Sequence, residues 1–310
     1  MSSPDQPFRI LSLDGGGAKG FYSLGVLREV EALVGKPLHQ AFDLIFGTST
    51  GAIIASLLAL GHSVDEIHRL YKEHVVRIMR RKSASEKSSA LGDLARSVFR
   101  DQTFDAAKTR LGVVATHWEL ERPMIFKSSD AQAHGRKGTF VPGFGIPIGD
   151  AVVASCSAYP FFEKKLVTTA EGDRIELVDG GYCANNPTLY AIADASRALT
   201  QSTDSLRVLS VGVGTYPAPK PALFSKMWLA RYLQSVQLLQ KTLEINTQSM
   251  DQLRRVLYAD VATVRINDTF EKPEMATDLF EHDLDKLNLL RQRGAESFAK
   301  REQDLAALFA

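Results

Sequence analysis

The chain has 310 residues, of which 45% are hydrophobic and 24% charged, enough apolar material for a substantial core and unlike a wholly disordered protein. Lysine and arginine total 37 and aspartate and glutamate 36, so the net charge of +1 gives no support for binding a nucleic-acid polymer through bulk charge. The longest apolar stretch, Ala52–Leu60, is far shorter than the roughly 20 residues of a membrane span.

The start of the chain and its cysteines favour a cytoplasmic location. Residues 1–10 lack the basic and apolar regions of a signal peptide. Two cysteines, Cys156 and Cys183, are too few for a disulfide framework, and no Cys/His cluster has the spacing of metal ligands. We therefore expect two reduced thiols and no metal ion.

Strand and helix patterns alternate from the beginning of the chain. Apolar and polar residues alternate over 8–13, which predicts a strand that leads into Asp14-Gly-Gly-Gly-Ala-Lys-Gly20. A helical period over 21–34 follows. The second strand is expected over 42–46, and it leads into Gly47-Thr-Ser-Thr-Gly51.

The same alternation continues along the chain. Further strands are predicted over 111–116, 124–126, 175–178, 206–211 and 261–266, and further helices over 52–60, 150–157, 223–258 and 284–309, with two more that begin at the Ser63–Glu66 capping box and near Pro187. Residues 80–89 and 135–149 lose this periodicity and are expected to be loops. The order predicts an α/β fold with a mostly parallel central sheet and helices on both faces.

Three glycine-rich turns follow the predicted strands that end at Leu13, Phe46 and Val178. The carboxyl ends of parallel strands meet at one edge of a sheet, so we expect the three turns to converge there.

A site drawn from turns so far apart in sequence requires one domain. We expect a single domain over 1–310, with a motif-bearing core over about 8–215 and a C-terminal helical part over about 216–310 packed on it.

The second turn, Gly47-Thr-Ser-Thr-Gly51, fits the G-x-S-x-G pattern of a nucleophilic serine. That chemistry needs a sharp strand-to-helix turn that presents a hydroxyl at a helix N-terminus, and the glycines permit the close approach of neighbouring chains. The helix dipole favours negative charge near Ser49. An ordinary turn with a capping serine is the alternative, but the flanking strand and apolar helix favour the nucleophile.

The first turn contains G-x-G-x-x-G as Gly15, Gly17 and Gly20, which a dinucleotide-binding loop would also show. That motif needs an acidic residue at the end of the second strand, whereas this strand ends in the serine turn and Glu29 and Glu31 fall inside the intervening helix. A P-loop is excluded because no Gly-Lys-Ser/Thr follows. Consecutive glycines can instead offer backbone N–H donors to an oxyanion, each worth about 3–4 kcal/mol.

A nucleophilic serine needs a general base. Beyond Asp179 the only histidine is His282, in an acidic stretch typical of a solvated helix start, and it is a weak candidate. Most of the other histidines are expected at the surface or as caps: His39, His62, His68, His74, His117 and His134. Asp179, at a strand end in Asp179-Gly-Gly181, is the remaining candidate, because a carboxylate can act as a base if its surroundings raise its pKa. By itself this segment also fits an Asp-Gly turn.

Taken together, Asp14-Gly-Gly-Gly-Ala-Lys-Gly20, Gly47-Thr-Ser-Thr-Gly51 and Asp179-Gly-Gly181, in that order, resemble the motifs of the patatin-like phospholipases. The segment Val152–Phe162 also resembles the Ala/Ser-rich segment that precedes a Pro-Phe turn in that family. One departure is Lys19, which stands where the family usually has arginine and lacks the planar fork of that side chain.

The resemblance implies a three-layer αβα sandwich and a lipid acyl hydrolase with a Ser–Asp dyad. Ser49 would attack an ester of a membrane phospholipid or galactolipid while Asp179 takes its proton. The oxyanion would be held by the N–H groups of Gly15, Gly16 and Gly17. Water activated by Asp179 would then release the fatty acid, without a metal or cofactor. Supporting roles are implied for the other motif positions, Asp14, Lys19, Gly20, Gly47, Gly51, Gly180 and Gly181.

The short chain and near-minimal core also resemble the cyclic-nucleotide-activated phospholipases of bacterial anti-phage defence. That resemblance implies a cyclic di- or trinucleotide activator, a homo-oligomer and action at the inner face of the membrane. The alternatives are a nucleotide-binding regulatory protein that uses the glycine-rich loop, and a patatin-like lipase or esterase without a role in defence.

A basic cluster follows the helix that begins at the capping box. It consists of Arg77, Arg80, Arg81 and Lys82. Such a cluster complements the dipole at a helix C-terminus, and it also suits contact with anionic lipid head groups or a mobile lid.

Overall fold

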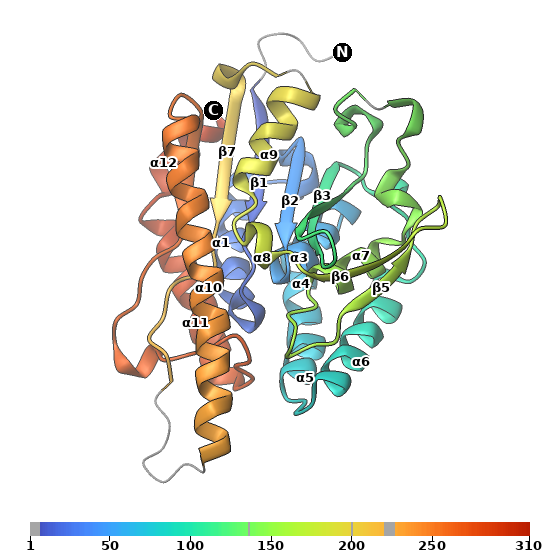
Figure 1. Ribbon diagram of the computed structural model, residues 1–310. Coiled ribbons are helices and arrows are strands. Elements are labelled where there is room, and N and C mark those ends of the chain that lie inside the picture. The colour runs from blue at the N-terminus through green and yellow to red at the C-terminus, as the bar shows by residue number, and fades with distance from the viewer. Residues whose placement is uncertain (1–6, 136, 200, 220–226) are drawn as a thin grey trace.

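The computed structural model describes residues 7–135, 137–199, 201–219 and 227–310, and it has three layers, with a sheet between two layers of helices (Figure 1). Within these ranges the sheet has eight strands in the order β5-β6-β3-β2-β1-β7-β8, with β4 paired to β3 off this path. The run from β3 to β8 is parallel, whereas β4, β5 and β6 are antiparallel to their neighbours. The predicted α/β fold with a mostly parallel sheet is confirmed.

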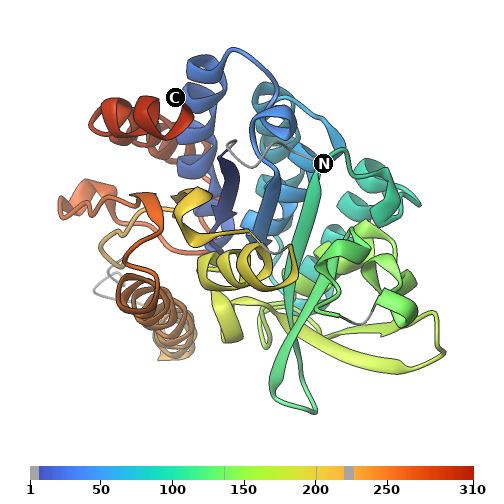
Figure 2. The same cartoon turned by 90° about the horizontal axis from the view of Figure 1, so that it is seen from above.

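Alternation along β1 (Phe8–Leu13) divides the interior into two cores. Phe8 and Ile10 pack with α9 (Thr188–Ala193) on one face of the sheet. Leu11 and Leu13 belong to the larger core on the other face, with α1 (Gly20–Val34) and α3 (Thr50–Leu60). Figure 2 shows the blue α1 and the yellow α9 on opposite sides of the strands. The central strands are therefore buried on both faces, as parallel strands usually are.

Most predicted elements are present, with ends shifted by a few residues. The strands after β1 are β2 (Leu44–Thr48), β3 (Arg110–His117), β4 (Arg122–Lys127), β5 (Lys165–Thr168), β6 (Arg174–Asp179), β7 (Leu206–Val211) and β8 (Ala262–Ile266). The remaining helices are α2 (Leu38–Ala41), α4 (Val64–Leu70), α5 (Val76–Met79), α6 (Ala84–Leu94), α7 (Ile148–Ser155), α8 (Gly181–Ala184), α10 (Met227–Leu257), α11 (Leu284–Ala299) and α12 (Glu302–Phe309). Residues 223–226, where the long C-terminal helix was expected to begin, lie outside the described ranges, and no pattern predicted β5.

The loop predicted over 80–89 is wrong, because α6 begins inside it. Ser83 caps this helix: its Oγ accepts a hydrogen bond from the N–H of Glu86, and the Glu86 carboxylate accepts one from the N–H of Ser83. The buried face of α6 carries Lys87 as well as Ala90 and Leu91, so charged and serine residues hide the helical period in the sequence. A capping box, not hydropathy, was the signal for this helix.

β6 runs antiparallel to β3, whereas a parallel strand was expected at this position. Sequence analysis placed the third glycine turn at the carboxyl edge of a parallel sheet. Asp179 pairs with Ala115 of β3, and Thr48 at the end of β2 pairs with the adjacent Val114. The turns do converge, but β6 arrives from the opposite direction and stops level with the end of β2.

The C-terminal part of the chain contributes to the same layers as the N-terminal part. β8 extends the sheet beside β7, and α11 packs along α1. The helix expected over 284–309 is interrupted between α11 and α12. Within the described ranges, no helix combines the length and apolarity that crossing a bilayer requires.

Close packing of α1 on α11 gives a stability prediction. A Cβ atom on Gly25 of α1 would lie 1.9 Å from the carbonyl oxygen of Arg291 in α11. Gly25→Ala should lower the free energy of unfolding by about 1–3 kcal/mol, although alanine normally favours a helix interior by about 1 kcal/mol. Denaturant unfolding measures the change. Gly138→Ala, where a Cβ meets nothing within 4 Å, is the control, and unchanged stability of Gly25→Ala would contradict this packing.

Candidate active site

Ser49 occupies a strained turn between β2 and α3. Its backbone has φ 52° and ψ −122°, a conformation that residues other than glycine rarely adopt. A Cβ on Gly47 would lie 2.3 Å from the carbonyl oxygen of Gly51, and a Cβ on Gly51 would lie 2.3 Å from that of Leu13. The two glycines of the motif are therefore required by close backbone approach, as the G-x-S-x-G pattern predicts.

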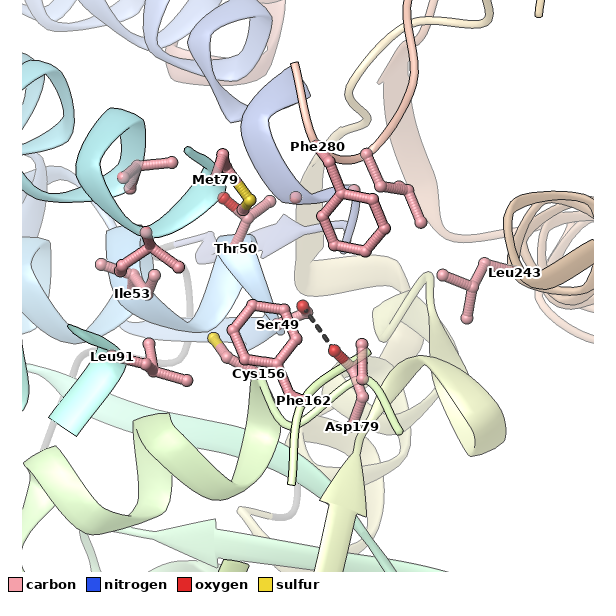
Figure 3. A pocket seen from close by; sticks show the side chains of 16 residues that line it. Ser49, Thr50, Ile53, Met79, Leu91, Cys156, Phe162, Asp179, Leu243 and Phe280 are labelled. Carbon is pink, nitrogen blue, oxygen red and sulfur yellow. Dashed lines mark hydrogen bonds between the residues drawn. The ribbon is translucent and has the colours of Figure 1, made fainter. Parts of the chain in front are cut away.

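Ser49 and Asp179 form a hydrogen-bonded pair. The Ser49 hydroxyl donates to Oδ2 of Asp179 at 2.7 Å (Figure 3). The N–H of Gly181 donates to Oδ1 of the same carboxylate at 2.7 Å. Asp179 is only 2% exposed. Burial raises the pKa of Asp179 to about 7, against the opposing effect of the Gly181 N–H and the Ser49 hydroxyl. A carboxylate with a pKa near neutrality can accept the proton of a serine hydroxyl.

Ser155 holds the backbone of the nucleophile, a role that sequence analysis missed. The N–H of Ser49 donates to Ser155 Oγ at 2.8 Å, and Ser155 Oγ donates to the carbonyl oxygen of Val114 at 2.5 Å. Ser155 ends α7 and lies in the Ala/Ser-rich segment Val152–Phe162, which was the available signal. The chain thereby ties the strained turn to the central strand β3.

A second clamp acts one residue further on. Tyr71, fully buried, donates from its hydroxyl to the carbonyl oxygen of Thr50 at 2.7 Å and lies 2.8 Å from Thr50 Oγ1. Gly20 fits against the same two side chains, because a Cβ there would lie 2.6 Å from Thr50 Oγ1. Gly20 therefore supports the turn by close packing.

The glycine loop supplies two free donors to the site and not three. The N–H of Gly15 donates to the carbonyl oxygen of Asn185 at 2.9 Å, so Gly15 is corrected from an oxyanion donor to a structural position. Gly16 and Gly17 line the same pocket as Ser49, and in the part of the chain that the structure describes neither N–H donates a hydrogen bond. Gly16 and Gly17 remain the candidate donors.

The other motif residues anchor this loop and the turn after β6. Asp14 forms a two-pronged ion pair with Arg265 of β8, with N–O distances of 2.9 and 2.5 Å. Lys19 is buried and its ammonium lies 3.5 Å from Oε1 of Glu244 in α10. Gly180 approaches β3 so closely that a Cβ would lie 2.1 Å from the carbonyl oxygen of Val114.

An apolar pocket opens beside the Ser49–Asp179 pair. It contains about 550 Å³ of free space, a volume that includes the solvent at its mouth. Its apolar walls come from widely separated parts of the chain and include Ile53, Ile78, Leu91, Phe162, Leu243 and Phe280 (Figure 3). The pocket can therefore hold an acyl chain with its ester next to the Ser49 hydroxyl.

No histidine lines this pocket within the described ranges. His282 is exposed, and its Nδ1 lies 3.1 Å from the carbonyl oxygen of Phe280. His68, His74 and His117 are buried, so the expectation of surface positions is wrong for these three. Burial lowers the pKa of His68 to about 4, because it disfavours the charged ring.

Sequence and structure comparisons were made with known proteins. Residues 11–192 match the sequence profile of the patatin-like phospholipases. The chain belongs to this family. The glycine loop, the serine turn and the Asp-Gly-Gly turn are thus the patatin-like motifs, and the structure gathers them round one pocket.

Two relatives carry descriptions of activity. A cUMP-AMP-activated phospholipase of Escherichia coli is 64% identical over 304 residues, which cover 97% of this chain and 93% of that protein. A cGAMP-activated phospholipase of Pseudomonas aeruginosa strain BWHPSA011 is 29% identical over 223 residues, 68% of this chain and 64% of that protein. VipD from Legionella pneumophila shares the fold, with a TM-score of 0.50 and 13% identity over 97% of this chain and 67% of that one.

The raised pKa of the Asp179 carboxyl in this patatin-like site gives a pH prediction. Only the deprotonated carboxylate can accept the Ser49 proton, so kcat/KM should rise about tenfold per pH unit below a pH of about 7 and level off above it. Initial rates on a soluble nitrophenyl ester, measured between pH 5 and 9, provide the profile. If the base had an ordinary carboxyl pKa, kcat/KM would instead stay nearly unchanged over that pH range.

Proposed function

We propose that this patatin-like protein is a phospholipase of the acyl-hydrolase type that uses a Ser49–Asp179 dyad. The observation that carries the proposal is the 2.7 Å hydrogen bond from Ser49 Oγ to a buried carboxylate at the wall of an apolar pocket. The activity named for the relative that is 64% identical supports the same reaction.

The reaction proceeds in two halves. Ser49 Oγ attacks the ester carbonyl as its proton passes to Oδ2 of Asp179, and the oxyanion accepts hydrogen bonds from the N–H groups of Gly16 and Gly17. The proton then passes to the leaving lysolipid alcohol, and the acyl-enzyme remains. A water molecule loses a proton to Asp179, attacks the acyl carbonyl and releases the fatty acid, and the proton returns to Ser49. Nucleophile and base both come from the chain, so the scheme requires no metal or cofactor.

The substrate we propose is a membrane phospholipid, with the protein acting at the inner face of the membrane. The apolar pocket takes one acyl chain. Cys156 and Cys183 are free thiols, which suits the reducing interior of a cell.

We also propose that a cyclic di- or trinucleotide activates the enzyme as part of bacterial anti-phage defence. The support is that relatives at 64% and 29% identity are described as activated by cUMP-AMP and cGAMP. Assembly into a homo-oligomer on activation stays a prediction.

The dyad is tested by fatty-acid release from phospholipid vesicles with and without cUMP-AMP or cGAMP. Ser49→Ala and Asp179→Asn should each lower release by about 10³-fold or more, since members of a catalytic unit act together. Ser89→Ala, at an exposed position on α6, is the matched control. Release that survives Ser49→Ala would overturn the mechanism.

The basic cluster gives a separate prediction about the membrane. Ile78 and Met79 line the apolar pocket, and Arg80 and Arg81 follow them directly and are exposed. Figure 1 shows α5 and α6 at the end of the molecule toward which β2 and β7 point. We propose that the cluster contacts anionic head groups, each cation adding about 1 kcal/mol.

Charge reversal at Arg80 and Arg81 should therefore lower hydrolysis of anionic vesicles about tenfold or more and leave that of a soluble ester unchanged. Arg301→Glu, at an exposed position near α12, is the control. Activity of the double variant on anionic vesicles equal to that of the unchanged protein would assign the cluster to the helix dipole alone.

A further inference from the structure

A second pocket lies across the glycine loop from the catalytic one, and we name it the polar pocket. Gly16, Leu243 and Leu279 line both pockets. The polar pocket has about 380 Å³ of free space, a volume that includes the solvent at its open mouth. Amide and hydroxyl side chains line much of it, namely Asn185, Gln240, Thr247, Gln248 and Asn267.

Polar groups in this wall lack full partners. Oδ1 of Asn185 is buried, and in the described part of the chain no hydrogen bond reaches it. The Lys19 ammonium is also buried, and its 3.5 Å contact with Glu244 is longer than the about 2.7–2.9 Å of a close charge-assisted hydrogen bond. A buried polar atom without a partner destabilises the protein, so a ligand that hydrogen-bonds these groups would gain binding free energy.

The charges of the wall nearly cancel. Lys19 is paired with Glu244, and the carboxylate of Asp14 is paired with Arg265. A polar wall whose charges are paired, with both donors and acceptors, suits the edge of a nucleobase and a sugar hydroxyl better than a cluster of phosphates. The open mouth leaves the phosphates of such a ligand in solvent.

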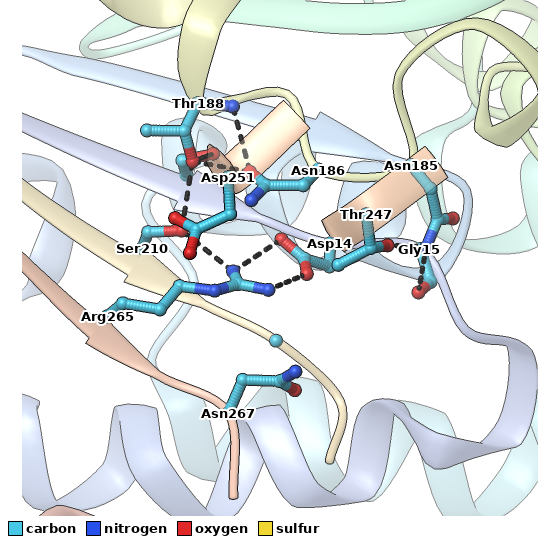
Figure 4. Close-up of polar contacts among 12 residues, drawn as sticks. Asp14, Gly15, Asn185, Asn186, Thr188, Ser210, Thr247, Asp251, Arg265 and Asn267 are labelled. Atoms are coloured by element: carbon cyan, nitrogen blue, oxygen red, sulfur yellow. Dashed lines mark hydrogen bonds and ion pairs between the residues drawn. The ribbon is translucent and has the colours of Figure 1, made fainter. Parts of the chain in front are cut away.

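Asn185, which lines the polar pocket, is hydrogen-bonded to Gly15 of the glycine loop (Figure 4). Nδ2 of Asn185 donates to the carbonyl oxygen of Gly15 at 3.2 Å and to Oγ1 of Thr247 in α10 at 2.8 Å. The carbonyl oxygen of Asn185 accepts from the N–H of Gly15. Gly15 precedes the two candidate oxyanion donors, so a shift of Asn185 would move them.

The helix α10 also holds the turn that carries the catalytic base. Asn246 accepts from the N–H of Asn185 at 2.8 Å and donates to the carbonyl oxygen of Cys183 at 3.0 Å. A Cβ on Gly181 would lie 2.7 Å from the side chain of Leu243. One helix thus contacts both the oxyanion loop and the segment that follows Asp179.

We propose that the polar pocket binds one nucleoside half of the cyclic dinucleotide activator, and that its occupancy, through Asn185 and α10, sets the position of the Gly16 and Gly17 N–H groups. This inference rests on the nucleotide activation proposed above. A phospholipid head group is the competing occupant, because the two pockets adjoin, but the excess of amides over cations favours the nucleotide.

Binding is tested first, in full-length Ser49→Ala protein, so that catalysis plays no part. Calorimetric titration with cUMP-AMP, and with cGAMP in parallel, compares this protein with one that also carries Gln248→Trp, which fills the mouth of the pocket from an exposed position. The expected result is an affinity about tenfold or more weaker, equivalent to about 1.4 kcal/mol. Gln252→Trp, on the solvent side one turn further along α10, is the control and should bind as Ser49→Ala alone does.

Coupling is tested with an active Ser49 and a variant that breaks one contact. Thr247→Val removes the hydroxyl bonded to Asn185 Nδ2, and it should lower the fold-activation by nucleotide more than it lowers nucleotide affinity. Ester hydrolysis with saturating cUMP-AMP, divided by the rate without it, gives the fold-activation. Circular dichroism of each variant checks that it is folded.

Three outcomes would overturn the proposal. If the Ser49→Ala protein binds neither of the two nucleotides, the polar pocket is not a nucleotide site. If Gln248→Trp leaves the nucleotide affinity unchanged, the nucleotide binds elsewhere. If Gln248→Trp in a protein with an active Ser49 raises the KM for vesicles, and the nucleotide affinity is unchanged, the pocket binds the lipid head group instead. In each case the proposed phospholipase activity is tested separately, by the Ser49-dependent release of fatty acid.

Discussion

The candidate catalytic centre depends on one hydrogen bond, from Ser49 to Asp179, between residues 130 positions apart in sequence. The strand β3 makes this bond possible. Val114 of β3 pairs with Thr48 at the end of β2, and the next residue, Ala115, pairs with Asp179 at the end of β6. Because β4 covers the other edge of β3, the parallel β2 and the antiparallel β6 share one edge of this strand and meet end to end between Val114 and Ala115. A slip of one residue in either register would turn the paired side chain to the other face.

That hydrogen bond exists in an energetically unfavourable setting. Burial raises the pKa of Asp179 to about 7, because the carboxylate has lost most of its water and gains only the Gly181 N–H and the Ser49 hydroxyl. Ser49 itself has a backbone conformation that non-glycine residues avoid. Ser155 and Tyr71 hold the turn in place, and the large core around α1 and α3 provides the stability that offsets this strain.

The C-terminal part of the chain is as much a component of the site as the motifs are. β8 supplies Arg265, the ion-pair partner of Asp14 at the start of the glycine loop. The helix α10 contacts Lys19 and Asn185, and Leu243 and Phe280 complete the apolar wall. The match to the family profile covers residues 11–192, whereas Arg265 and the residues of α10 that hold the glycine loop lie beyond that range.

The sequence by itself determined most of the order of elements and the serine turn, and the resemblance of its motifs to the patatin-like family indicated Ser49 and Asp179 as the candidate dyad. Those inferences depend on local features: glycines where backbones meet, a hydroxyl between strand and helix, and a specific order of motifs. Only the tertiary structure decided that β6 is antiparallel, that Gly15 donates to Asn185, and that Ser155 holds the nucleophile. Strand direction and hydrogen-bond partners are set by long-range packing, which leaves no periodic pattern in the chain. The helix α6 lies between these cases, since its capping box was visible but its mixed polar face was not decisive.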